Sequence, residues 1–140
     1  MANTTDSDEY RDATRVFYDR HLTRGEAKEK AECDGAPWNQ VIYEYMWGPT
    51  EFHATGNLVD FDLSHRLHTI DIPVLFLTGE FDEARPETIS KFHKMIPGSE
   101  FIVIGGVAHA SLSRAPDNYR RILEDFLDKV EKNTSISRSQ

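Results

Sequence analysis

Two residues that could take part in proton transfer each follow a short apolar stretch of the chain. Asp82 comes after the stretch 72–79, and His109 comes after the stretch 100–105. A carboxylate can hold an imidazole in one tautomer and stabilise its protonated form, while the imidazole accepts a proton from a nucleophile. Taken alone, Asp82 is most simply a turn or helix-cap residue and His109 an exposed loop residue. Their order, each beyond its own apolar stretch, favours an acid and a base that act together.

Alternating strands and helices are predicted to position this pair. Both stretches are apolar and bounded by turn residues, which is typical of strands buried in a parallel sheet. Pro86 opens a helix between the stretches and Pro116 opens one after them, each with an apolar stripe. The order strand, helix, strand, helix predicts two parallel strands with a right-handed crossover. Reactive groups in such sheets gather beyond the carboxyl ends of the strands, where Asp82 and His109 stand.

The N-terminal half of the chain has no convincing strand. The sequence predicts three segments: helices and loops over 1–68, the strand–helix–strand–helix part over 69–131, and a disordered tail over 132–140. The first helix is indicated by apolar residues at helical spacing behind the cap Asp6-Ser7. A second amphipathic helix opens at Pro37 and ends at Gly48-Pro49, because proline cannot continue a helix.

The composition is that of a globular protein with an acidic surface, which narrows the possible functions. The formal net charge of −8 argues against nucleic acid as a partner, because phosphate binding needs clustered Lys and Arg. An acidic surface tolerates a cationic ligand instead. No stretch is long and apolar enough to span a membrane, and the first residues do not form a secretory signal. The single cysteine, Cys33, forms no internal disulfide and is compatible with a reducing, cytoplasmic location.

The remaining histidines do not indicate a metal site, and no cofactor is expected. His65 and His68 lie three residues apart, but no third ligand is spaced to join them. His21 and His93 fall on amphipathic helices and are expected at the surface or at the edge of the core.

A nucleophile to work with the pair is missing from the sequence. In hydrolases of this architecture the chain order is Ser, then Asp or Glu, then His, and the serine occupies a sharp Gly-x-Ser-x-Gly turn. None of the nine serines has glycine at both flanking positions, and Ser111 and Ser113 follow His109 too closely. Cys33 follows no strand. Two strands alone also leave their apolar faces without neighbours, so we expect a piece of a larger hydrolase, or a chain that pairs with a separate serine-bearing partner.

Longer motifs make the chain similar to one family. The motifs are residues 17–22, 46–52, 55–58, 60–62 and 79–83, with Pro86 and His109. Through them the chain resembles the C-terminal half of the proline iminopeptidases, serine aminopeptidases of the α/β-hydrolase superfamily. The most specific are Trp47-Gly48-Pro49-Thr50-Glu51-Phe52 and Asp82-Glu83. The resemblance implies an α/β fold with a helical cap segment and return loop over 1–68, followed by two β-α units, without the family's N-terminal strands and nucleophile elbow.

The resemblance also implies roles for five residues. Asp82 would be the triad acid and His109 the triad base. Glu51 and Glu83 would bind the free amino terminus of a substrate, because a desolvated ammonium needs charge-assisted hydrogen bonds. Trp47 would line the substrate pocket. Without the family pattern, the two glutamates are ordinary exposed carboxylates and the tryptophan is more often a core residue.

The function implied is release of an N-terminal residue, such as proline, from a small peptide or amide. The chain by itself is expected to be inactive, as a truncated or split form that lacks the nucleophile. Two alternatives remain open: a non-catalytic remnant that binds peptides or regulates, and a biosynthetic amidase or esterase of the same fold. Neither nucleic acid nor a membrane is expected as a partner.

Overall fold

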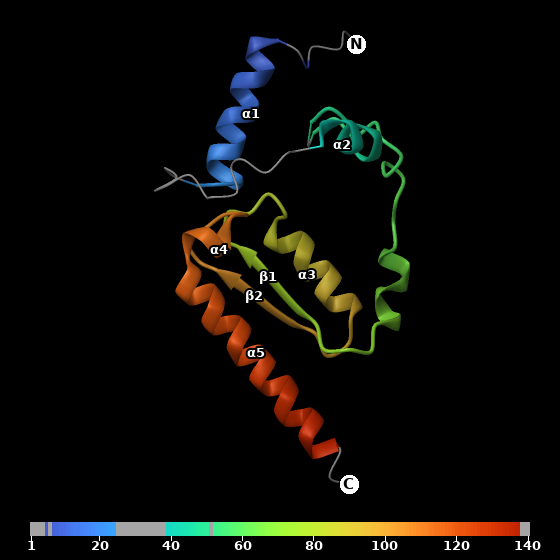
Figure 1. Ribbon diagram of the computed structural model, residues 1–140, viewed down its shortest axis with the longest axis vertical. Coiled ribbons are helices and arrows are strands. Elements are labelled where there is room, and N and C mark those ends of the chain that lie inside the picture. The colour runs from blue at the N-terminus through green and yellow to red at the C-terminus, as the bar shows by residue number, and fades with distance from the viewer. Residues whose placement is uncertain (1–4, 6, 25–38, 51, 138–140) are drawn as a thin grey trace. The chain divides into compact units, whose positions relative to one another are not determined.

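The computed structural model describes residues 5, 7–24, 39–50 and 52–137 (Figure 1). In chain order its elements are α1 (Asp8–His21), α2 (Gln40–Met46), the 3₁₀ helix η2 (Ser64–Thr69), β1 (Leu75–Gly79), α3 (Pro86–Met95), β2 (Glu100–Ile104), α4 (Ser111–Arg114) and α5 (Pro116–Ser137). They belong to two compact units, which we call the sheet unit (residues 1–26 and 68–140) and the inserted unit (residues 27–67). The sequence predicts α1 within the 1–68 segment, whereas in the structure it groups with the strands.

The two predicted strands pair in parallel. The register runs from Leu75 opposite Glu100 to Gly79 opposite Ile104. Parallel strands need a crossover, and α3, which begins at Pro86 as predicted, connects them and packs against both. Because the strands run in the same direction, the loops that follow them leave from the same edge of the sheet (Figure 1).

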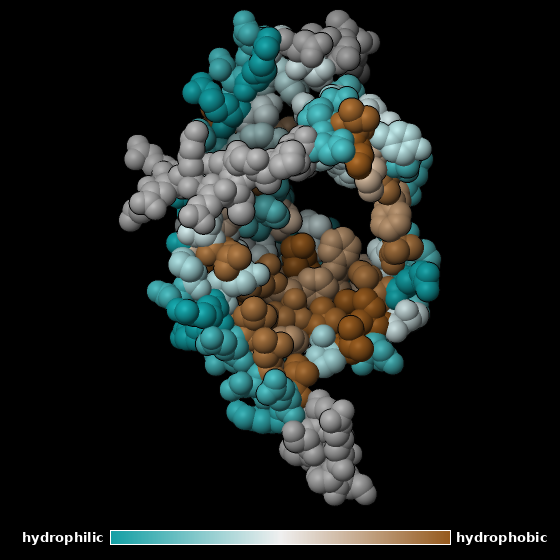
Figure 2. All heavy atoms as spheres, in the orientation of Figure 1, coloured by the Kyte–Doolittle hydropathy of each residue, from teal (hydrophilic) through white to brown (hydrophobic). Residues whose placement is uncertain are grey.

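Packing in the sheet unit is tightest where these loops leave. The buried apolar side chains of the described residues are Ile96, Ile104, Val107 and Ala108. Three of the four lie at the end of β2 or in the loop after it. Elsewhere many large apolar side chains remain exposed, and Figure 2 shows an open apolar surface over the strands and α3. The best-packed part of the sheet unit is therefore the edge of the sheet from which the loops with Asp82 and His109 leave.

The helices α1 and α5 of the sheet unit begin at residues that favour the start of a helix. Ser7 caps α1, since its hydroxyl accepts a hydrogen bond from the Tyr10 N–H at 3.2 Å. α5 begins at Pro116 as predicted and lies beside β2, where Lys129 Nζ and Glu100 Oε2 are 2.7 Å apart. The helix continues to Ser137, so the structure differs from the tail predicted from residue 132. None of the described helices combines the length and apolar character that crossing a bilayer requires.

The inserted unit is built around α2 and the turn after it. Asn39 caps the helix, because its side-chain oxygen accepts from the Ile42 N–H at 3.1 Å. α2 ends at Met46, in agreement with the predicted stop at Gly48-Pro49, and its predicted opening at Pro37 lies outside the described residues. Gly48 has a φ of +148°, and a side chain there would collide with the backbone oxygen of His53. The glycine therefore permits the sharp return of the chain.

Candidate functional site

The loops after the two strands are bonded to each other. We call them the Asp82 loop (residues 80–85) and the His109 loop (residues 105–110). The Glu80 N–H donates to Ile104 O at 2.9 Å, and the Phe81 N–H donates to Val107 O at 3.0 Å. The Glu80 carboxylate accepts a further bond from the Gly106 N–H at 2.8 Å. These bonds continue the pairing of the strands into the loops and fix one loop relative to the other.

Asp82 is a buried carboxylate with several donors around it. Its side chain is only 6% exposed. Oδ1 accepts from the Ala84 N–H at 2.8 Å, and Oδ2 accepts from the Gly79 N–H at 3.4 Å. A buried carboxylate without donors would cost several kcal/mol, so these backbone groups make its burial possible. The loop therefore holds Asp82 in one orientation.

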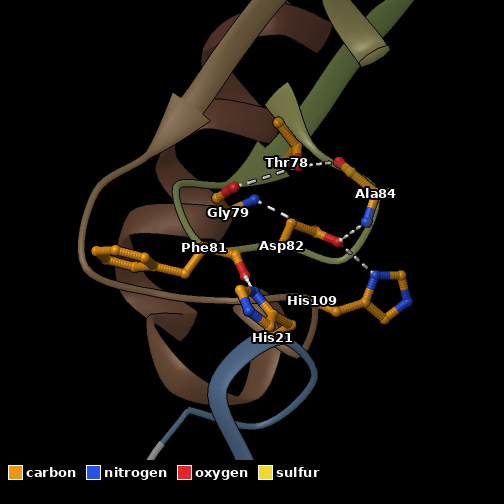
Figure 3. A network of polar contacts seen from close by, with 7 residues as sticks. All are labelled: His21, Thr78, Gly79, Phe81, Asp82, Ala84 and His109. Carbon is orange, nitrogen blue, oxygen red and sulfur yellow. Dashed lines mark hydrogen bonds and ion pairs between the residues drawn. The ribbon is translucent and has the colours of Figure 1, made fainter. Parts of the chain in front are cut away.

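His109 is the third partner of this carboxylate. Its Nδ1 lies 3.0 Å from Asp82 Oδ1 (Figure 3). Since a carboxylate accepts hydrogen bonds, the contact favours the imidazole form with the hydrogen on Nδ1. The His109 side chain is 53% exposed, in contrast to Asp82. The arrangement thus leaves Nε2 as the nitrogen that can exchange a proton with another molecule.

The residues just before Asp82 close the turn that carries it. Thr78 is buried, and its hydroxyl donates to Ala84 O at 3.2 Å. The Asp82 N–H donates to Gly79 O at 3.3 Å. The end of β1 is thereby bonded to Asp82 and to Ala84, and Figure 3 shows the bond between Thr78 and Ala84. The position of the carboxylate is thus set by short-range bonds within the loop as well as by the neighbouring loop.

The C-terminal end of α1 contacts both loops. The backbone oxygen of His21 accepts from the N–H groups of Glu83 and His109, both at 3.2 Å. The Arg24 guanidinium lies over the Phe81 ring, 3.3 Å from its centroid. A helix end leaves carbonyl groups without partners inside the helix, and here loop N–H groups satisfy some of them.

Two cavities of the sheet unit are both lined by Asp82. One of about 410 Å³ is also lined by His109, Ser111 and Tyr119. The other, of about 480 Å³, has Asp82 and three glutamates in its lining, against a single arginine. That arginine, Arg85, forms an ion pair with Glu87 at 3.4 Å. The second cavity therefore has an acidic lining that suits a cationic group.

Comparison with known proteins gives concordant matches in sequence and in structure. A proline iminopeptidase from Heyndrickxia coagulans is 37% identical over 130 residues, which make up 91% of this chain and 45% of that protein. One from Saccharolobus solfataricus is 32% identical over 126 residues, with 87% and 40% covered. The crystal structure of proline iminopeptidase from Mycobacterium smegmatis matches with a TM-score of 0.80 at 31% identity, covering 95% of this chain and 46% of the other.

The chain is related to the C-terminal part of the proline iminopeptidases. The crystal structure of VinJ matches as well, with a TM-score of 0.74 at 30% identity, covering 92% of this chain and 45% of the other. No protein-family model matches the chain. The predicted resemblance and the partial α/β fold are thus confirmed. The chain spans less than half the length of these proline iminopeptidases.

The structure brings together some of the residues that the proline iminopeptidase resemblance singles out. Asp82 and His109 are in contact, and Glu83 lies half-buried in the Asp82 loop beside the acidic cavity. Trp47 follows α2 as its C-terminal cap in the inserted unit. Glu51 lies outside the described residues. The roles of these five residues remain predictions.

Neither of the two serines near His109 lies in a nucleophile turn. The Ser113 hydroxyl donates to Ala110 O at 3.0 Å, so its hydrogen is directed at the backbone. Ser111 is buried at the start of α4, and its N–H donates to His109 O at 2.8 Å. Both are too close in sequence to form the sharp strand-to-helix turn of a hydrolase nucleophile. Within the described residues, no group of three or more His, Cys, Asp or Glu could hold a metal ion.

Two residues that support the pair were not expected from the sequence. Glu80 connects the two loops through Gly106. His21, expected to be a surface or core-edge residue, bonds to the Asp82 loop through its ring and to both loops through its backbone. His21 precedes Phe81 by 60 residues, so no local spacing indicates the contact. Only its place at the end of a predicted helix marks it as a residue that could meet a loop.

Proposed function

We propose that the chain carries the acid and the base of a serine aminopeptidase triad, with Asp82 as acid and His109 as base. The observation that supports this most directly is the 3.0 Å contact between the buried carboxylate and Nδ1 of a half-exposed imidazole. If both side chains were exposed, the same contact would be an ordinary surface ion pair, which contributes little to stability and does not indicate a function. A carboxylate held by two backbone N–H groups and directed at one imidazole nitrogen is what the triad needs.

In the proposed reaction, Nε2 of His109 takes the proton of a serine hydroxyl. The serine oxygen then bonds to the carbonyl carbon of the scissile amide. The same proton passes from Nε2 to the leaving nitrogen as the carbon–nitrogen bond breaks. Water then gives a proton to Nε2 and its oxygen bonds to the acyl carbon; the proton passes to the serine oxygen as the ester bond breaks. Asp82 stabilises the imidazolium through Nδ1–H. The serine comes from the part of the hydrolase fold that this chain does not span, on the same polypeptide or on a separate partner chain.

The proposed substrate is a small peptide or amide with a free N-terminal residue such as proline. The relatives are named proline iminopeptidases. A cationic amino terminus fits the acidic cavity beside Asp82, to which Glu83 contributes. Glu51 would supply a second carboxylate and Trp47 an apolar wall. Two carboxylates favour a charged amine and disfavour a blocked terminus, which leaves them desolvated and unpaired.

A chimera tests the proposal. The corresponding C-terminal part of the Heyndrickxia coagulans relative is replaced by this chain, so that the relative supplies the serine half. We expect the chimera to release a fluorogenic amine from its L-prolyl amide and to spare the N-acetylated substrate. His109→Ala should lower kcat by about 10⁴-fold or more. A folded chimera whose turnover survives His109→Ala would refute the assignment.

The same assay separates the two other functions. Binding of a prolyl peptide by the folded chimera without any turnover would indicate a binding or regulatory remnant. Turnover of N-blocked esters in preference to free amines would indicate a biosynthetic amidase or esterase. The intact contact between Asp82 and His109 favours the hydrolytic assignment, because a binding module has no need of a buried carboxylate directed at an imidazole.

A further inference from the structure

One residue remote in sequence, His21, bonds to the backbone on both sides of Asp82. Its ring Nδ1 lies 2.9 Å from Phe81 O, in the residue just before Asp82. Its own backbone oxygen accepts from the N–H of Glu83, the residue just after, at 3.2 Å. Figure 3 shows the His21 ring pointing at the Phe81 carbonyl. The peptide groups that flank the carboxylate are thus both held by a single residue of α1.

The same residue also holds the other member of the pair. The backbone oxygen that accepts from Glu83 accepts from the His109 N–H as well, again at 3.2 Å. The next carbonyl, that of Leu22, accepts from the Ala110 N–H at 2.9 Å. Loops are more mobile than helices. Hydrogen bonds from the end of α1 to both loops therefore restrain the positions of the Asp82 loop and the His109 loop relative to the same helix.

The His21 ring also lies beside the ring of Phe17. Its centroid lies 4.7 Å from that of Phe17, one helical turn earlier. A carbonyl oxygen can only accept, so the contact requires a hydrogen on Nδ1 of His21. The neutral Nδ1–H tautomer and the imidazolium both provide it. The contact is therefore compatible with either charge state of His21.

We propose that His21 is the positioning residue of the Asp82–His109 pair. It restrains the backbone before and after Asp82 and the backbone of His109, and thereby keeps Asp82 Oδ1 within reach of His109 Nδ1. The inference rests on the proposed function only for the catalytic meaning of the pair. The contacts belong to the chain itself, so the positioning role is measurable in the absence of any serine half.

The test uses ¹⁵N-labelled full chain and measures the tautomer of His109. Imidazole nitrogen chemical shifts, recorded where the ring is neutral and assigned with His109→Gln, give the ratio of the Nδ1–H to the Nε2–H form. His21→Phe keeps a ring against Phe17 and removes the donor, whereas His21→Asn restores a donor near the Nδ1 position. We expect His21→Phe to lower the Nδ1–H to Nε2–H ratio by about twofold to tenfold, the effect of one ordinary hydrogen bond. His21→Asn should recover most of it.

Two further variants make each outcome decisive. Phe17→Leu removes the ring contact and keeps the donor, so it should lower the Tm and leave the His109 tautomer unchanged. A tautomer shift in Phe17→Leu equal to that in His21→Phe, or a shift fully accounted for by unfolding, would mean general packing and would overturn the positioning role. Asp82→Asn should by itself reverse the tautomer preference. If Asp82→Asn changes the His109 tautomer ratio and His21→Phe does not, the positioning role of His21 is wrong, and the hydrogen bond between Asp82 and His109 is retained as an interpretation. If Asp82→Asn leaves the ratio unchanged, the hydrogen bond between Asp82 and His109 is itself refuted.

Discussion

Gly79 packs directly against the carbonyl oxygen of Ala108, with no room for a side-chain carbon between them. A Cβ on Gly79 would collide with this oxygen and would lie 2.6 Å from that of Val107. Ala108 is fully buried and immediately precedes His109. The last residue of β1 and the His109 loop therefore approach each other too closely for a side chain to fit between them.

Gly79→Ala is expected to destabilise the sheet unit by about 1–3 kcal/mol, because the obstructing atoms are backbone and cannot rotate away. The measurement is the urea midpoint of the full chain. Gly105→Ala is a matched control in the neighbouring loop, since a Cβ there would meet only a Glu80 carboxylate oxygen at 3.9 Å. Equal stability of the two variants would contradict this account of the close approach.

Asp82→Asn should lower kcat of the active chimera by about 10⁴-fold and leave KM nearly unchanged. The amide has almost the shape of the carboxylate, but it can donate to Nδ1 and so favour the wrong tautomer of His109. Steady-state kinetics on the prolyl amide measure the split between kcat and KM. Asp117→Asn, an exposed change in the first turn of α5, serves as the control. A large rise in KM at constant kcat would assign Asp82 to substrate binding instead.

Glu83→Gln should reduce kcat/KM for a free-amine substrate by about 10-fold to 100-fold, the loss of one charge-assisted hydrogen bond of about 1.5–3 kcal/mol. The rate on the N-acetylated substrate should not fall. Glu87→Gln is the matched control, because Glu87 lines the same cavity but pairs with Arg85. Glu51→Gln is expected to behave like Glu83→Gln. Unchanged kinetics in both Glu51→Gln and Glu83→Gln would end the amine-binding assignment.

The isolated chain should self-associate. Among the described strands β1 pairs only with β2, so the sheet has open edges, and Leu112, Leu123 and Leu127 are exposed. Open strand edges and large apolar surfaces promote association. Sedimentation velocity across a concentration series measures this directly. A monomer at all concentrations that unfolds in a sharp, reversible transition would show that the sheet unit is sufficient by itself.

The regular elements could be predicted because their signals are local. Pro86 and Pro116 mark the helix starts, and the apolar stretches before Asp82 and His109 mark the strands. The parallel pairing followed from the order of elements, and the contact between Asp82 and His109 followed from that pairing. The grouping of α1 with the strands had no such signal. It depends on contacts between His21 and loop residues that lie 60 or more positions later in the chain, which no periodic pattern encodes.

The end of α5 shows a different limit of sequence reasoning. Residues after 131 are mostly polar, and this composition predicts a disordered tail. Polar side chains are equally compatible with a solvated helix, since hydrogen bonding along the backbone requires no apolar stripe. The helix already established from Pro116 therefore continues to Ser137.

The chain leaves the sheet unit after α1 and returns to it before β1, so residues 27–67 form a separate compact unit between two parts of one body. Among the described residues, the bonds that hold Asp82 and His109 lie within that body. Under the proposed roles, a change in length or sequence between residues 27 and 67 would alter the surroundings of Glu51 and Trp47 and leave these bonds in place, provided that the end of α1 is kept. Substrate preference could then change separately from the Asp82–His109 pair.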